Sequence, residues 1–196
     1  MRHPIPDFPP LFPCGEWWRL FLAARLVGGP EARAIAEANG GCGLRPRQWM
    51  RLEIAGGAVV SLPVSGGAST LKNRPALSWM LAPEARREVR KGALTLATAY
   101  GRQPFFHLLE PLLELPDGEM PAASALCMEA FVKVKGVVGL DDESLLDALR
   151  EGIAVGDPRL RAVAADCRRK FEPGLSIVDL LVRMGPDAIF ALITPF

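Results

Sequence analysis

The sequence predicts a single α/β domain in which a small sheet, including an antiparallel hairpin, is covered by about six helices. Three observations support this class. The chain has 196 residues, of which 49% are hydrophobic, as expected for one well-packed domain spanning residues 1–196. Two short apolar runs flank a Gly-Gly pair, and several longer segments with helical periodicity are bounded by Pro or Gly. No repeat of fixed period is present.

The hairpin is expected over residues 48–54 ("QWMRLEI") and 58–64 ("AVVSLPV"). These runs have the length of strands, and they are separated by "AGG" at 55–57. Glycine pairs favour the left-handed backbone of tight hairpin turns, so we expect antiparallel pairing. The following stretch, 65–75, is polar and contains glycine without an apolar period, which predicts a mobile loop.

The clearest helix is expected over residues 84–100, where apolar side chains recur at helical spacing and Gly101 follows as a C′ residue. The proline-dense start delays helix formation until after Pro13. Other helices are expected at 16–27, 121–136, 143–152, 174–185 and from 186 onward. Residues 31–43 fit either a helix turn or a degenerate strand, and the pattern does not decide between them.

The charge balance argues against nucleic-acid and membrane-surface partners. The 23 Lys and Arg residues nearly cancel the 22 Asp and Glu residues, which leaves a net charge of +1. The most apolar early stretch, 17–27, contains two arginines and is too short to cross a bilayer. An anion site, if present, must therefore be local.

The four cysteines lie far apart without a C-x-x-C pair, and only two histidines could complete a metal shell, so no metal site is expected. The N-terminus has prolines where a signal peptide needs an apolar core. We therefore expect a cytoplasmic protein with reduced thiols and no cofactor. The sequence gives no indication of an oligomeric state.

Four blocks occur in order: "PPLFPCGEWWRLFLAARLV", "RPRQWMRLEIAGGAVVSLPVSGG", "TLATAYGRQPFFHLLEPLL" and "FEPGLSIVDLLVRMGPDA". Together they resemble the short form of the WbqC-like family, and the last two blocks are the specific ones. The chain departs from the family pattern at "GGPEARAIAEANGG" and "EARREVRKG", where relatives carry an acidic pair, a Trp-Arg and a His. The resemblance implies a bacterial transferase of surface-polysaccharide (O-antigen-type) synthesis, with an amino acid or acyl group transferred to a sugar.

Arg51, inside the first expected strand, matches the strand arginine of the family. A strand arginine facing away from Trp49 could bind a carboxylate or phosphate with two parallel hydrogen bonds, and Trp49 is itself a candidate substrate-binding residue. Arg45 and Arg47 add positive charge at the strand entrance. Arg87 belongs to a basic helix face that could reach the same anion if the helix packs beside the hairpin. Solvated arginines explain these patterns equally simply.

Tyr100, the single tyrosine, lies on the apolar stripe at the end of the 84–100 helix. We expect its ring to be buried beside Phe105 or Phe106 and its hydroxyl to require a partner. A packed helix exit is one interpretation, and a cleft facing the Tyr100 hydroxyl and Arg102 is the other. His107 is a further candidate substrate-binding residue, with Glu110 as the one nearby orienting acid. Ser176 is expected to cap a helix.

Two functional hypotheses follow from these patterns. The first is a transferase whose small-molecule substrate, such as a nucleotide sugar or an amino-acid or acyl donor, binds near Arg51. The second is a non-catalytic relative that acts as a binding or scaffolding protein, since the acidic pair and the helix His are missing. A pocket in which Arg51 converges with an acid, a His or the Tyr100 hydroxyl would favour the first.

Overall fold

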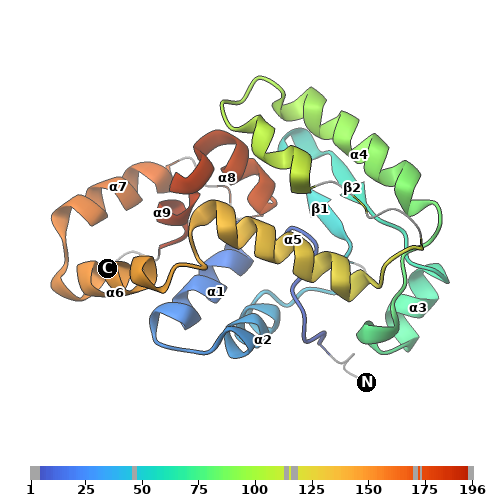
Figure 1. Cartoon of the computed structure of the whole chain (residues 1–196), viewed down its shortest axis with the longest axis horizontal. Helices are drawn as coiled ribbons and strands as arrows, with labels where there is room; N and C mark the ends of the chain where they lie inside the picture. Colours follow the sequence, from blue (N-terminus) through green and yellow to red (C-terminus); the bar gives the residue numbers. More distant parts are fainter. Residues whose placement is uncertain are drawn as a thin grey trace.

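The computed structural model describes residues 5–45, 48–112, 115, 119–169, 172 and 174–193. Over these residues the protein combines nine α-helices with one two-stranded antiparallel sheet (Figure 1), which confirms the predicted fold class. The α-helices are α1 (Gly15–Leu26), α2 (Glu31–Gly41), α3 (Gly67–Asn73), α4 (Ala85–Tyr100), α5 (Ala123–Val138), α6 (Glu143–Val155), α7 (Pro158–Arg168), α8 (Ile177–Met184) and α9 (Ala188–Leu192).

The predicted hairpin is confirmed, although its ladder is shorter than the two apolar runs. Strand β1 (Arg51–Glu53) pairs with β2 (Val59–Ser61), and Leu52 lies opposite Val60 on the buried face. The turn requires its glycines, because Gly56 and Gly57 both have positive φ, at 81° and 76°. This backbone conformation is the physical reason why Gly-Gly indicated a hairpin.

The mobile loop expected at 65–75 is wrong, because this segment contains α3. Gly66 precedes α3 in the left-handed conformation, and a side chain at this position would come within 2.2 Å of the Thr70 hydroxyl. Thr70 is buried and Leu71 packs against the core, so two side chains anchor a mostly polar helix. Two buried side chains in so short a helix do not produce an apolar repeat that the sequence would show. The undecided segment 31–43 is also helical, over α2.

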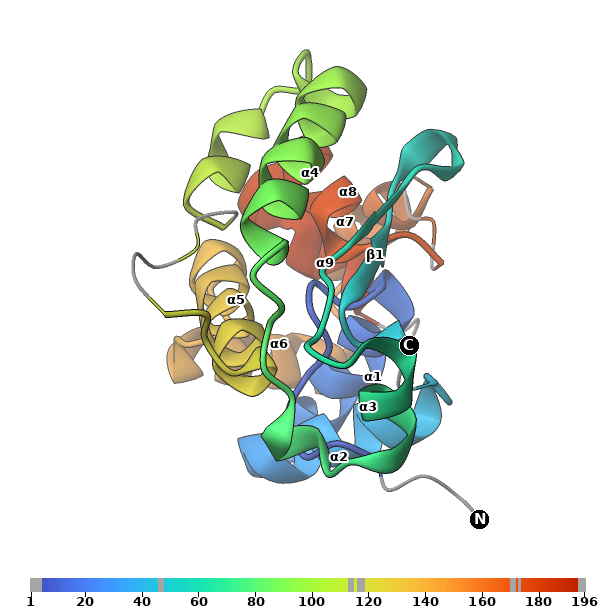
Figure 2. The same cartoon turned by 90° about the vertical axis from the view of Figure 1, so that its right-hand side faces the viewer.

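Helix α4 confirms the prediction for 84–100 and lies along the hairpin (Figures 1 and 2). Gly92 packs against the sheet, where an added Cβ would come within 2.7 Å of the Val60 side chain. Gly101 follows the helix with right-handed rather than left-handed backbone. Glycine is nevertheless required there, since a Cβ would lie 2.5 Å from the Ala97 carbonyl oxygen.

The core is centred on α5, which crosses the middle of the molecule in Figure 1. An aromatic cluster from α1 and α5 fills its centre, with ring centroids 5.2 to 6.0 Å apart. Its members are Trp17, Trp18, Phe21 and Phe131. Helix α8 is buried on nearly every side, with Arg183 its one partly exposed residue. The close packing of the four aromatic rings and of the almost fully buried α8 restricts the movement of the neighbouring elements.

Buried Asn39 of α2 ties the proline-rich N-terminal segment to the helices. Its side-chain oxygen accepts a hydrogen bond from Trp17 Nε1 at 2.8 Å. Its amide nitrogen donates to the carbonyl oxygens of Pro6 and Phe8 at 2.8 and 3.1 Å. A buried amide with all these partners supplies the donors that a proline-rich chain lacks.

Ser176, at the start of α8, joins three distant parts of the chain. Its backbone N–H donates to the Glu53 carbonyl of β1 at 2.8 Å, and its hydroxyl donates to the Phe12 carbonyl at 2.9 Å. The same hydroxyl accepts from Val178 N, which confirms the predicted helix cap. The following acid, Asp179, does not complete a capping box, because its carboxylate accepts a hydrogen bond from Arg183 instead.

Among the described residues, no helix combines the length and the apolar character that a membrane span requires.

Replacing Ser176 with Ala is expected to lower the free energy of unfolding by about 1–3 kcal/mol, because a buried carbonyl and the α8 cap both lose their partner. Ser78 offers a matched control, since its hydroxyl also bonds a carbonyl, that of Pro75, but is exposed. Ser78→Ala should change stability by less than about 0.5 kcal/mol. Urea unfolding followed by tryptophan fluorescence measures both; equal effects would contradict the role of Ser176.

Candidate functional site

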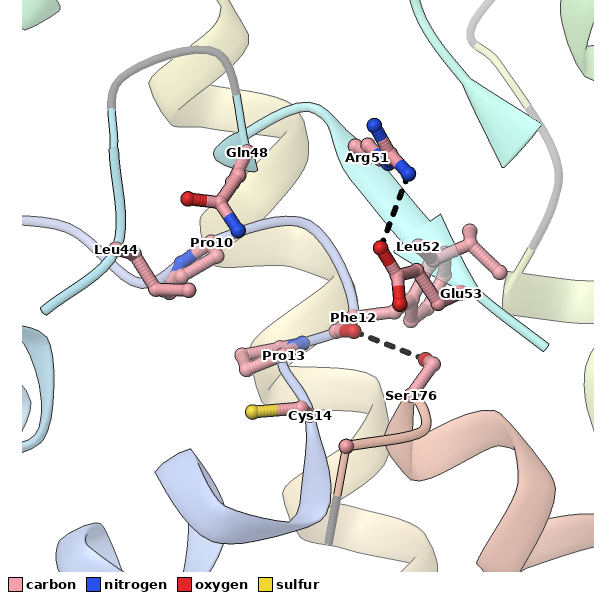
Figure 3. A pocket seen from close by; sticks show the side chains of 11 residues that line it. Pro10, Phe12, Pro13, Cys14, Leu44, Gln48, Arg51, Leu52, Glu53 and Ser176 are labelled. Atoms are coloured by element: carbon pink, nitrogen blue, oxygen red, sulfur yellow. Dashed lines mark hydrogen bonds and ion pairs between the residues drawn. The ribbon is translucent and has the colours of Figure 1, made fainter. Parts of the chain in front are cut away.

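A pocket of about 180 Å³ lies where the N-terminal segment, the start of the hairpin and the start of α8 meet (Figure 3). Arg51 and Glu53 stand at one side of it and Cys14 at another (Figure 3). Its walls are formed by Pro10, Phe12, Pro13, Cys14, Leu44, Gln48, Arg51, Leu52, Glu53, Gly174 and Ser176. The same contacts that fix Ser176 therefore hold this pocket open.

Arg51 and Glu53 form an ion pair on the exposed face of β1. They are two residues apart in a strand, so their side chains leave the same face, and Arg51 Nη2 lies 3.0 Å from Glu53 Oε1. The side chains are 40% and 52% exposed. Ion pairs this accessible to water contribute little to stability, so a ligand anion can replace Glu53 at the guanidinium at small cost.

The pocket wall contains one strained residue. Phe12 has φ 45°, the single left-handed non-glycine residue in the described part of the chain. Its side chain is buried, and its carbonyl oxygen accepts the Ser176 hydroxyl at 2.9 Å. Packing and this hydrogen bond together hold a conformation that costs about 1–3 kcal/mol.

Cys14 is the cysteine of the pocket lining, and its thiol is more acidic than an ordinary cysteine. Interaction with Cys42, helped by backbone N–H groups of Trp17 and Glu16, lowers the pKa of Cys14 to about 7 against the opposing effect of burial. The same interaction raises the pKa of the Cys42 thiol well above its usual value. The interaction therefore favours the thiolate at Cys14 and the protonated thiol at Cys42.

Trp49, predicted as a binding residue, has a structural position. It precedes β1, is 1% exposed and donates its indole N–H to the Phe8 carbonyl at 3.1 Å. Its own carbonyl accepts a hydrogen bond from Leu11 N at 2.7 Å. Trp49 thus supports the pocket through the N-terminal segment, and it is absent from the lining.

The ring of Tyr100 is 2% exposed, as predicted. Its hydroxyl accepts a hydrogen bond from Ala55 N in the hairpin turn at 2.9 Å. Burial, with the neighbouring Asp179 charge, raises the pKa of Tyr100 to about 12. Burial likewise raises the pKa of Asp179, although Arg183 lies 2.8 Å away. The hydroxyl therefore fastens α4 and α8 to the hairpin turn and does not line the Arg51 pocket.

The remaining predicted residues also lie away from the Arg51 pocket. Arg87, Arg102 and His107 are exposed, and none belongs to its lining. The His107 ring is 6.4 Å from that of Phe105, which itself packs against Gly185. Helix α4 does pack beside the hairpin as required, but Arg87 projects into solvent. Of the predicted site residues, the structure places only Arg51 in this pocket.

Several lining residues were missed by sequence reasoning. Glu53 could have been found, because strand alternation puts it on the same face as Arg51. Gln48 accepts a hydrogen bond from Arg45 N at 2.8 Å, which orders the approach to β1; Arg47 lies outside the described residues. Cys14 and Ser176 carry no local signal, because only the folded chain brings them to the hairpin.

A second cavity, of about 470 Å³, lies between α7 and the C-terminal helices. Arg183, Asp166 and Asp187 supply its charged groups, and Phe105 and Met184 its apolar wall. Ala162, Val163 and Cys167 complete its lining. The described residues also contain no group of three potential metal ligands.

In comparisons with protein-family models, curated proteins and solved structures, nothing matches the chain.

Tyr100 allows a direct titration, because it is the one tyrosine of the protein. Its phenolate absorbance should appear with a midpoint near pH 12 in the folded protein and near the ordinary value of 10 when unfolded. Between these values only the unfolded chain loses the proton, so the free energy of unfolding should fall by about 1.4 kcal/mol per pH unit.

Stopped-flow pH jumps can record the folded phenol before the protein unfolds. Tyr100→Phe supplies the control, since it lacks the absorbance and should lose this alkaline destabilisation. A midpoint near 10 in the folded wild type would contradict the buried hydroxyl.

Proposed function

We propose that the chain is a cytoplasmic transferase of bacterial surface-polysaccharide (O-antigen-type) synthesis that binds an anionic activated sugar, or an amino-acid or acyl donor, at the Arg51 pocket. The supporting observation is the convergence of Arg51 with the acid Glu53 beside a pocket. The resemblance of the four sequence blocks to the WbqC-like family supplies the reaction class.

In the proposed binding step, the ligand anion replaces the Glu53 carboxylate at the Arg51 guanidinium. A guanidinium presents paired donors that match a carboxylate or phosphate, and the exposed Glu53 carboxylate already occupies one of them. An incoming anion takes this position and displaces Glu53. The freed carboxylate then lies within reach of the bound group, where it can accept a proton from an attacking hydroxyl or amine.

The volume limits what the pocket encloses. About 180 Å³ is below the usual range for a whole drug-sized ligand, which starts at roughly 300 Å³. It suits one charged end, such as a carboxylate, an amino acid or a single phosphate. The rest of a nucleotide sugar would extend across the exposed face of β1.

The non-catalytic alternative draws support from the positions of the other candidates. The Tyr100 hydroxyl is engaged by the hairpin turn, and the exposed His107 does not line the pocket. A binding protein would need only Arg51 and the pocket walls. The two functions differ in whether the bound donor is consumed when an acceptor sugar is added, which mass spectrometry can follow.

A thermal-shift screen tests the binding step with nucleotide sugars, aminoacyl conjugates and acyl phosphates. A ligand at a hundred times its Kd should stabilise the wild type by about 2.7 kcal/mol. Arg51→Ala should abolish this shift, because the anion loses its partner. Arg87→Ala is the matched control: it removes an exposed arginine outside the pocket and should leave the shift unchanged.

Two results would contradict the proposal. One is the absence of a shift with every member of the three ligand classes. The other is an equal shift in the wild type and Arg51→Ala, which would place the ligand elsewhere.

A further inference from the structure

Two cysteines that are distant in the sequence lie at the start of α1 and at the end of α2, and their thiols interact. Cys14 is the N-cap of α1, and Cys42 follows the last turn of α2. Only residues 27–30 connect the two helices, so the chain reverses direction and they form a helical hairpin.

The contacts between α1 and α2 determine which residues of the two helices lie opposite each other. Trp17 of α1 bonds to Asn39 of α2 at 2.8 Å. In an antiparallel pair, the next contact one turn further lies three residues earlier on one helix and three residues later on the other. Those positions are Cys14 and Cys42. Gly41 tightens the approach, since an added Cβ would lie 2.7 Å from Leu20 of α1.

The surroundings of this pair are suited to thiol chemistry. Both cysteines are partly accessible, whereas Cys127 and Cys167 are buried. Cys14 also lines the Arg51 pocket, and its Sγ is directed away from β1 in Figure 3. The interaction with Cys42 is the main influence that lowers the pKa of Cys14 to about 7, and the backbone N–H groups of Trp17 and Glu16 lower it further. Glu16 is the charged neighbour that opposes it.

We propose that Cys14 and Cys42 form a peroxide-reactive dithiol site, in which Cys14 is the attacking thiolate and Cys42 the resolving thiol. The site is independent of the function proposed for the pocket, because its chemistry requires only the two sulfurs and a hydroperoxide.

The reaction balances in two steps. The Cys14 thiolate attacks the terminal oxygen of the hydroperoxide, the O–O bond breaks, and the released alkoxide or hydroxide takes a proton from water, leaving Cys14 as a sulfenic acid. The Cys42 sulfur then attacks the Cys14 sulfur, and the departing hydroxide takes the Cys42 proton to become water. The two sulfurs together lose two electrons, and the peroxide gains them.

The experiment treats the reduced full-length protein with one equivalent of hydrogen peroxide and then with an excess of iodoacetamide. Peptide mapping by mass spectrometry should find a Cys14–Cys42 disulfide, reversed by dithiothreitol, with Cys127 unoxidised. Recovery of alkylated Cys14 and Cys42 at the level of the untreated sample would overturn the proposal, as would a disulfide that pairs either with another cysteine.

Two variants separate the roles of the sulfurs. Cys14→Ser should fold, because serine is a preferred N-cap, and it should lose peroxide consumption by at least tenfold. Cys42→Ser should leave Cys14 as a sulfenic acid that dimedone traps. Dimedone labelling of Cys42 in Cys14→Ser, at the rate found for Cys14 in Cys42→Ser, would reverse the assignment and overturn it.

A measurement on the wild type keeps the test valid if a variant fails to fold. The iodoacetamide rate at Cys14, followed as a function of pH, should be half-maximal near pH 7. In the same digest Cys127 should react at least tenfold more slowly because it is buried. Equal rates for the two thiols at neutral pH would show that Cys14 is not activated.

Discussion

The three hydrogen bonds of Ser176 are the constraint on which the pocket and the packing around it depend. One residue near the end of the chain bonds to the N-terminal segment through Phe12 and to the hairpin through Glu53. It also begins α8, the most completely buried helix. Because α8 cannot shift within the core, the positions of Phe12 and β1 are fixed relative to it, and the space between them persists as a pocket.

The fold class and the main elements could be predicted because their signals are local. The Gly56-Gly57 turn needs positive φ, and the apolar stripe of 84–100 needs a face to bury, so both patterns report a physical requirement. Helix α3 could not be predicted, because a few anchoring contacts such as Thr70 decide it. The burial of Gly92 likewise depends on where Val60 of β2 lies against α4.

The candidate site could be predicted only at Arg51, and the reason is geometric. A pattern of residue types suggests which side chains have useful chemistry, but it does not show which of them converge. Tyr100 was correctly expected to be buried with a partnered hydroxyl, yet the partner is a backbone N–H of Ala55 that carries no sequence signal. Glu53 was overlooked although its spacing from Arg51 already placed the two on one face of the strand.

The Arg51 pocket is built from segments that are far apart in the sequence, and this affects when it forms during folding. Phe12 and Ser176 are separated by 164 positions, and β1 lies between them in the sequence. Closing so long a loop costs entropy before any contact repays it, so these contacts form late in folding. A nascent chain that has not yet reached α8 lacks Ser176 and therefore lacks the hydrogen bonds that join this helix to Phe12 and Glu53. The wall of the pocket is therefore complete only when both ends of the chain have come together.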